Sequence, residues 1–165
     1  MKFSSLLLLC FLSHLAWSQK DLGVILEKYN DGSVPYIQVE ELAQLIIQKR
    51  NIKLLDTREA SEYSISHIQE SIYAGYDDFD LKSIQNHIKK NDTIIVYCSI
   101  GVRSERIGKN LKKAGYHTVL NLYGGIFEWV NNGMDVYDHQ NKSTEKIHAY
   151  DRFWGVYLEK GLKVY

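Results

Sequence analysis

The most constraining feature of the sequence is the run Thr93–Tyr97, which places apolar side chains on both faces of a predicted strand. Such a strand is typical of the centre of a parallel sheet, where helices cover both faces. A short loop follows, beginning with Cys98, and then a helical pattern over 104–113. In parallel sheets the functional site lies beyond the carboxyl ends of the strands. The sequence therefore predicts that Cys98 lies in such a site.

Strand-like and helix-like segments alternate along most of the chain. This alternation predicts an α/β fold built around a parallel sheet. Arg58, Cys98 and the Tyr123-Gly124 turn each follow a predicted strand, so we expect them at the same edge of the sheet. We expect strands at 36–39, 53–56, 71–74, 93–97 and 117–122, with helices at 21–29, 40–50, 59–64, 81–90, 104–113 and 124–131.

The first eighteen residues predict a secretory signal peptide. Lys2 precedes a short apolar stretch, and Ala16 and Ser18 are small residues at the positions that a signal peptidase reads. Cleavage after Ser18 removes Cys10, so the mature chain keeps Cys98 as its single cysteine and has no internal disulfide. We expect an exported protein, periplasmic or secreted, without stable membrane association after cleavage. A retained membrane anchor is the alternative, but the apolar core is short and no basic stop sequence follows it.

Charge and length point to one ordinary domain. The chain has 20 Lys and Arg against 20 Asp and Glu, and residues 1–18 contribute only Lys2, which leaves 19 against 20 and a net charge of −1. This balance argues against a nucleic-acid partner. We expect a domain over 19–137, followed over 138–165 by a polar linker and an amphipathic helix packed on the domain. The apolar stripe of that helix is Tyr150, Phe153, Trp154, Tyr157 and Leu158.

An ordered set of motifs extends over about residues 36–136. Its members are Leu54-Leu55-Asp56-Thr57-Arg58-Glu59, Tyr63, His67-Ile68, Ser71-Ile72, Ile94-Ile95-Val96-Tyr97-Cys98, Gly101, Arg103-Ser104, Leu111, Gly115-Tyr116, Val119, Leu122, Gly124-Gly125-Ile126 and Trp129. This ordered set resembles the single-domain rhodaneses, a sulfurtransferase family. Departures stand around His67, where Ser66 and Gln69-Glu70 replace the glycine and proline-glycine usual in the family.

The resemblance implies a three-layer fold, with a central, mostly parallel five-stranded sheet and helices on both faces. It also implies that Cys98 accepts a sulfane sulfur from thiosulfate or a related donor. The resulting persulfide passes its outer sulfur to a nucleophilic acceptor such as a thiol or cyanide, and no cofactor takes part. The active-site loop implied by the resemblance is Cys98, Ser99, Ile100, Gly101, Val102, Arg103 and Ser104.

The chemistry of the loop residues agrees with this role. A thiolate is favoured by loop N–H groups, a helix N-terminus and the nearby charge of Arg103, which we also expect to hold an anionic donor. Gly101 permits a tight turn with positive φ. Ser104 is expected to cap the helix and to donate its hydroxyl toward the sulfur. Asp56 and Arg58 are expected to support the site by pairing with neighbours.

Two other functions fit parts of the pattern. A cysteine phosphatase or arsenate reductase places arginine six residues after the cysteine, whereas Arg103 stands five residues after Cys98, which indicates a smaller cradle. A non-catalytic binding or redox-sensing module is the second alternative, and the presence of Cys98 argues against it. His67 is expected to anchor a turn. No cluster of residues has the spacing of metal ligands, so no metal site is predicted.

Overall fold

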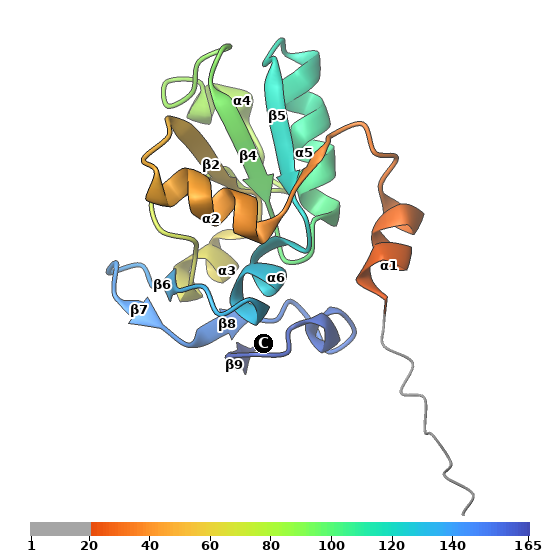
Figure 1. Ribbon diagram of the computed structural model, residues 1–165, viewed down its shortest axis with the longest axis vertical. Coiled ribbons are helices and arrows are strands. Elements are labelled where there is room, and N and C mark those ends of the chain that lie inside the picture. Colours follow the sequence, from red (N-terminus) through yellow and green to blue (C-terminus); the bar gives the residue numbers. More distant parts are fainter. Residues whose placement is uncertain (1–20) are drawn as a thin grey trace, which may run out of the picture.

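The structure is a computed structural model that describes residues 21–165. The predicted signal peptide and its cleavage site lie outside the described residues. Five parallel strands form a central sheet in the order β1-β5-β4-β2-β3, and helices cover both faces (Figure 1). The predicted α/β fold is therefore confirmed. The strands are β1 (Tyr36–Ile37), β2 (Ile52–Asp56), β3 (Ile72–Tyr73), β4 (Thr93–Tyr97) and β5 (Thr118–Leu122), and the helices are α1 (Leu22–Tyr29), α2 (Val39–Ile47), α3 (Ala60–Ile65), α4 (Leu81–Ile84), α5 (Val102–Lys113) and α6 (Gly125–Asn131).

The central strand β4 separates two parts of the hydrophobic core, as its apolar pattern predicts. Ile95 and Tyr97 pack with residues of α2 and α6, whereas Ile94 and Val96 pack with residues of α4 and α5. All four side chains are fully buried. Because β4 pairs with β2 on one side and β5 on the other, Cys98 leaves the sheet near its centre.

One helix of the domain is less than half as long as predicted. A helix is expected over 81–90, but α4 ends at Ile84 and the chain continues as a turn. The N–H of His87 donates to the carbonyl of Ile84, three residues back, which is the hydrogen bond of a 3-10 turn and not of an α-helix. Ile84 and Ile88 still enter the same core. The spacing of Ile84 and Ile88 therefore indicates that both side chains are buried on the same side, but it does not indicate a continuous helix.

The amphipathic helix predicted over 150–158 is wrong. The chain instead forms β8 (Lys146–His148), a short 3-10 turn η1 (Trp154–Tyr157) and β9 (Leu162–Val164), and the two strands pair in parallel. Tyr150 adopts a left-handed φ of 64°, which cannot continue a right-handed helix. The Asp151 carboxylate accepts hydrogen bonds at 2.8 Å from the N–H groups of Phe153 and Trp154, which fixes a local turn.

Residues 138–165 nevertheless pack on the domain. The polar stretch predicted as a linker forms an antiparallel hairpin between β6 (Val136–Tyr137) and β7 (Ser143–Thr144). Ile147, Ala149 and Leu158 then enter the same core as Ile95 and Tyr97. The arrowheads of β4 and β5 point toward the part of the molecule that holds β8 and β9 (Figure 1). The C-terminal segment therefore lies at the edge of the sheet where the site is expected.

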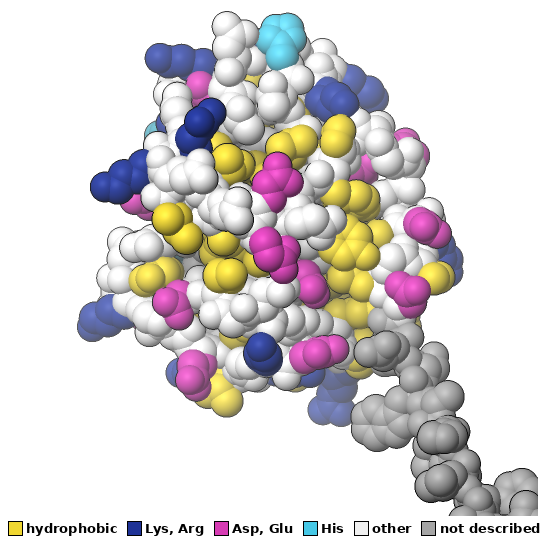
Figure 2. Space-filling view, in the orientation of Figure 1, with side chains coloured by type: hydrophobic (Ala, Val, Ile, Leu, Met, Phe, Trp, Pro, Cys, Tyr) yellow, Lys and Arg dark blue, Asp and Glu magenta, His cyan; other side chains and the backbone are white. Residues whose placement is uncertain are grey.

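The surface shows no strong separation of charge on the face that is drawn. Acidic and basic side chains are both scattered over it, with apolar side chains between them (Figure 2). Among the helices within residues 21–165, none has the length and apolar character needed to cross a lipid bilayer.

Candidate active site

Cys98 lies at the base of a pocket beyond the carboxyl end of β4. Its side chain is only 1% exposed, so a reactant must enter through the pocket to reach the sulfur. The pocket has a volume of about 230 Å³. It is lined by Tyr76, Cys98, Ser99, Ile100, Val102, Arg103, Tyr150 and Trp154. The structure thus brings the predicted loop together with two aromatic residues of the C-terminal segment.

Hydrogen-bond donors face the sulfur of Cys98. The N–H of Gly101 donates to Sγ at 3.1 Å, and the Ser104 hydroxyl lies 3.6 Å from it. Burial alone raises the pKa of the Cys98 thiol, but the charge of Arg103 and the donors of Ser104 and Gly101 together outweigh burial and lower it. The loop therefore favours the thiolate, which is the nucleophilic form of cysteine.

Gly101 is required where the loop enters α5. It has a φ of 103°, and a Cβ at this position would lie 3.3 Å from the carbonyl oxygen of Leu122. Gly101 is also the N-cap residue of α5, so the prediction that Ser104 caps this helix is wrong. Ser104 lies within the helix, where its hydroxyl donates to Asn121 Oδ1 at 2.7 Å. The Ser104 hydroxyl therefore lies within reach of both Asn121 Oδ1 and Cys98 Sγ.

The first turn of α6 holds the carbonyl groups of the Cys98 loop. The N–H of Ile126 donates to the Cys98 carbonyl at 2.9 Å, and that of Phe127 to the Ser99 carbonyl at 3.1 Å. Because the C=O and N–H of a trans peptide point in opposite directions, the N–H groups of Ser99 and Ile100 point away from α6. In the part of the chain that the structure describes, neither amide donates a hydrogen bond. The loop therefore presents free N–H donors, as anion-binding turns do.

Arg103 has a carboxylate partner that the sequence did not reveal. Its Nη1 and Nη2 donate to the two carboxylate oxygens of Glu62 at 2.6 and 2.7 Å, and Nη2 also donates to Ser99 Oγ at 3.0 Å. Burial alone raises the pKa of Glu62, but Arg103, Arg58 and the N–H of Glu59 together outweigh burial and lower it. The guanidinium expected to hold an anionic donor is therefore already paired with a carboxylate.

Glu62 also shapes the start of α3. Its carboxylate accepts a hydrogen bond at 3.0 Å from the N–H of Glu59, and together the two residues form a capping box. A glutamate three residues after the helix start is the sequence signal of such a box. That signal can reveal the cap, but it cannot reveal Arg103, which lies 41 positions further along the chain.

Two asparagines hold the backbone of Gly101. Asn121, fully buried in β5, donates from Nδ2 to the Gly101 carbonyl at 2.8 Å. Asn30, which follows α1, donates to the same carbonyl at 2.9 Å. Sequence reasoning assigned neither residue to the site. A polar residue inside an apolar strand signals Asn121, because a buried amide must be hydrogen-bonded.

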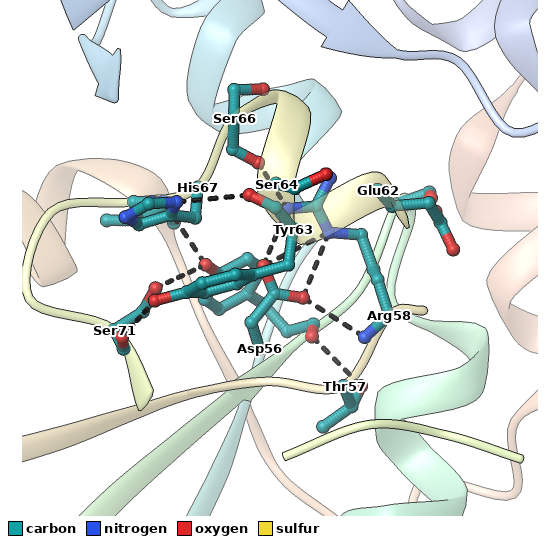
Figure 3. A network of polar contacts seen from close by, with 12 residues as sticks. Asp56, Thr57, Arg58, Glu62, Tyr63, Ser64, Ser66, His67 and Ser71 are labelled. Atoms are coloured by element: carbon teal, nitrogen blue, oxygen red, sulfur yellow. Dashed lines mark hydrogen bonds and ion pairs between the residues drawn. The ribbon is translucent and has the colours of Figure 1, made fainter. Parts of the chain in front are cut away.

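Asp56, the last residue of β2, forms a fully buried ion pair with Arg58 (Figure 3). Arg58 Nη2 donates to Asp56 Oδ2 and to the Ser66 carbonyl, both at 2.6 Å. Burial alone lowers the pKa of Arg58, but Asp56 reverses this and raises it. Neither residue is among those that line the pocket of Cys98, and their role as supporting residues stays a prediction.

His67 lies just after α3, where its backbone forms an isolated antiparallel bridge with Tyr137. Its Nδ1 lies 3.1 Å from the Tyr63 carbonyl, and its ring stacks on that of Tyr63 with centroids 4.1 Å apart (Figure 3). It does not line the pocket of Cys98. Within residues 21–165, no three His, Cys, Asp or Glu side chains are grouped closely enough to hold a metal ion.

Comparison with known proteins identifies the family of this fold and loop. A family model for the rhodanese-like domain matches residues 38–132, which is more than half of the chain. The chain belongs to the rhodanese-like domain family. Membership of this sulfurtransferase family confirms the resemblance seen in the motifs. It also gives the Cys98 loop a family context, while β8, η1 and β9 lie beyond the matched residues.

Individual relatives differ in length and in name. The putative sulfur carrier protein YrkF of Bacillus subtilis (strain 168) is 30% identical over 100 residues, covering 61% of this chain and 53% of that protein. A protein named Sulfurtransferase from Allochromatium vinosum is 28% identical over 100 residues, with coverage of 61% and 92%. The chain covers 32–53% of the length of several curated relatives, two of which are named tRNA uridine(34) hydroxylase.

A solved structure supports the fold. The crystal structure of thiosulfate sulfurtransferase from Pseudomonas aeruginosa has a TM-score of 0.60 at 23% identity, and the match covers 73% of this chain and 22% of that one. At this identity the likeness shows the fold alone.

Proposed function

We propose that this protein is an exported sulfurtransferase in which Cys98 carries a sulfane sulfur as a persulfide. The observation that carries the proposal is the geometry around Sγ, where the Gly101 N–H donates at 3.1 Å and the Ser99 and Ile100 amides have no acceptor among the described residues. N–H groups arranged in this way stabilise an anionic sulfur and the atom bonded to it. The relatives named as a sulfur carrier and a sulfurtransferase support the same chemistry.

The reaction consists of two displacements at sulfur. The Cys98 thiolate attacks the outer sulfur of thiosulfate, an S–S bond forms, and the original S–S bond breaks with its electron pair leaving on sulfite. A nucleophile such as cyanide or a thiolate then attacks the outer sulfur of the persulfide. The products are thiocyanate or a new persulfide, and the Cys98 thiolate is regenerated. No external oxidant or reductant is needed in either step.

The pairing of Arg103 argues against phosphoryl transfer. A phosphatase loop uses its arginine to clamp a phosphoryl group, but here the guanidinium donates to both oxygens of Glu62. A phosphate at this site would compete with that carboxylate for the same donors. We therefore expect negligible hydrolysis of aryl phosphates.

Mass spectrometry of the intact protein tests the proposal. After incubation with thiosulfate or with an organic sulfane-sulfur donor, the wild type should gain one sulfur atom and Cys98→Ser should gain none. Addition of cyanide should remove the sulfur and release thiocyanate. Absence of the adduct with every donor, together with hydrolysis of aryl phosphate that depends on Cys98, would overturn the proposal.

Export is tested separately. Expression of the full sequence should give a chain that begins at Gln19, which amino-terminal sequencing of the exported fraction detects. An exported chain that still begins at Met1 would contradict the proposed cleavage after Ser18.

A further inference from the structure

The mouth of the Cys98 pocket is built partly by residues beyond the matched domain. The family match ends at residue 132, whereas Tyr150 and Trp154 of the C-terminal segment line the pocket. Tyr76, from the loop after β3, lines it as well. Three aromatic side chains therefore line the pocket that contains a cysteine only 1% exposed. A reactant that enters through this pocket places its non-reacting part beside them.

Tyr150 is held in place despite an unfavourable backbone conformation. Its φ of 64° is uncommon for a bulky residue. The N–H of Tyr150 donates to His148 Nδ1 at 3.1 Å, and the centre of its ring lies 4.7 Å from Arg103 Cζ. Strained residues persist where the surrounding structure fixes them, and they concentrate at functional sites. Here the strained residue places an aromatic ring near Arg103, the basic residue of the described pocket lining.

Trp154 is fixed by other rings. Its ring centre lies 5.7 Å from that of Tyr29, 4.9 Å from that of Phe153 and 6.4 Å from that of Tyr157. The backbone N–H of Trp154 also donates to Asp151 Oδ1, and this hydrogen bond anchors the turn that carries Trp154. The pocket wall formed by Trp154 is therefore supported from both helix α1 and the turn η1. A supported aromatic wall offers a ready surface for an apolar or aromatic group.

The charge of the pocket does not favour a small dianion. Among the described residues that line the pocket, Arg103 is the one basic residue, and it is already paired with Glu62 through two hydrogen bonds. The loop amides stabilise charge at the sulfur, whereas Tyr76, Tyr150 and Trp154 offer aromatic faces at the mouth. A second negative charge placed there would lose part of its hydration without gaining an unpaired cation among the described lining residues.

We propose that Tyr76, Tyr150 and Trp154 select sulfane-sulfur donors that have an apolar organic group and a single negative charge, in preference to inorganic thiosulfate. This inference rests on the proposed sulfurtransferase function and names its substrate class. With an organic thiosulfonate, the Cys98 thiolate attacks the outer sulfur and forms the persulfide. The S–S bond of the donor breaks, and its electron pair leaves on the organic sulfinate.

Three donors separate charge from aromatic contact. Thiosulfate is a dianion, methanethiosulfonate is a small monoanion, and benzenethiosulfonate is a monoanion with a ring. The rate of persulfide formation divided by donor concentration is measured by quenched mass spectrometry for each. The donors differ in intrinsic reactivity. The decisive quantity is therefore the rate with benzenethiosulfonate divided by the rate with methanethiosulfonate, and this rate ratio is compared between wild type and variants.

Trp154→Ala and Tyr150→Gly remove one ring each, and the glycine also tolerates the left-handed backbone. We expect each variant to lower the ratio of the benzenethiosulfonate rate to the methanethiosulfonate rate by about fivefold to tenfold, which is the scale of one aromatic contact. The rate with methanethiosulfonate, which has no ring, should fall less than the rate with benzenethiosulfonate. Leu162→Ala is the matched control, because Leu162 is 57% exposed on β9 and does not line the pocket. It should leave both rates unchanged.

Each outcome decides one of the two claims. If no donor forms a persulfide, the proposed function fails. If persulfide forms but the ratio is the same in wild type, Trp154→Ala and Tyr150→Gly, the function stands and the selection by aromatic residues is overturned. Trp154→Leu, which keeps apolar volume without the ring, serves in place of Trp154→Ala if thermal melting shows that the latter is unfolded. A wild type that prefers thiosulfate over both thiosulfonates would also contradict the inference.

Discussion

At Cys98, burial and charge act on the sulfur in opposite directions. Burial favours the neutral thiol, whereas Arg103 and the donors of Ser104 and Gly101 favour the thiolate and prevail. We therefore predict that Arg103→Ala raises the pKa of Cys98, because the favourable charge is lost. Glu62→Gln should lower it below the wild-type value, because Arg103 then keeps its charge without the opposing carboxylate. The pH dependence of alkylation by iodoacetamide measures both shifts.

Arg106→Ala is the control for this pair of variants. Arg106 is exposed on the same helix and makes no contact with the sulfur or with Glu62 among the described interactions. Its alkylation profile should match that of the wild type. Shifts of the same sign in Arg103→Ala and Glu62→Gln would mean that charge at Arg103 does not control the thiol.

The buried pair of Asp56 and Arg58 predicts an asymmetric effect on stability. Arg58→Met leaves the Asp56 carboxylate without its partner in a site that is fully buried. We expect this variant to lose about 3–5 kcal/mol in the free energy of unfolding. The double variant Asp56→Leu with Arg58→Met removes both charges and should be the more stable of the two. Urea denaturation compares them, and a double variant less stable than the single one would contradict the argument.

At the scale of elements, the contact between α6 and the Cys98 loop depends on Gly125. Gly125 has a φ of 56°, and a Cβ there would lie 2.2 Å from the Cys98 carbonyl oxygen. Gly133 also has a left-handed φ, but nothing lies within 4 Å of a Cβ placed on it. We predict that Gly133→Ala costs about 1–2 kcal/mol from backbone strain alone. Gly125→Ala should cost more.

The two glycine variants also differ in chemistry. Displacement of the loop by Gly125→Ala moves the amides away from the sulfur, so the pKa of Cys98 should rise. In Gly133→Ala it should not change. Urea denaturation and the pH profile of alkylation measure the two effects. Equal losses of stability, with an unchanged pKa of Cys98 in both variants, would show that α6 does not determine the position of the Cys98 loop.

The elements of the sheet were predictable because their signals are local. The apolar run Thr93–Tyr97, the glycine at 101 and the helical pattern after it identify the central strand and the loop of Cys98. The pairing of Glu62 with Arg103 was not predictable, because the two residues are far apart in sequence. The prediction of a C-terminal helix was wrong for a related reason. A helical spacing of aromatic residues cannot reveal that Tyr150 turns the chain left-handed.

For the whole molecule, the central question is whether the C-terminal segment is part of the folding unit. Ile147 and Leu158 are fully buried in the core that also contains Tyr97. The N–H of Ala149 donates to the Val164 carbonyl at 2.7 Å, which closes the segment on itself. Burial of two large aliphatic side chains contributes roughly 3–6 kcal/mol. A segment with this much buried surface should unfold together with the sheet.

The position of the tryptophans tests this prediction. In a chain that begins at Gln19, Trp129 lies in α6 and Trp154 lies in the C-terminal segment. Fluorescence of Trp154→Phe then reports on the sheet domain, and that of Trp129→Phe reports on the C-terminal segment. Added to either background, Ile147→Ala should lower the free energy of unfolding by about 2–5 kcal/mol. Because one cooperative unit has one transition, the Ile147→Ala shift in urea midpoint should be the same in both backgrounds. A shift confined to the Trp129→Phe background would mean that the segment unfolds separately from the sheet.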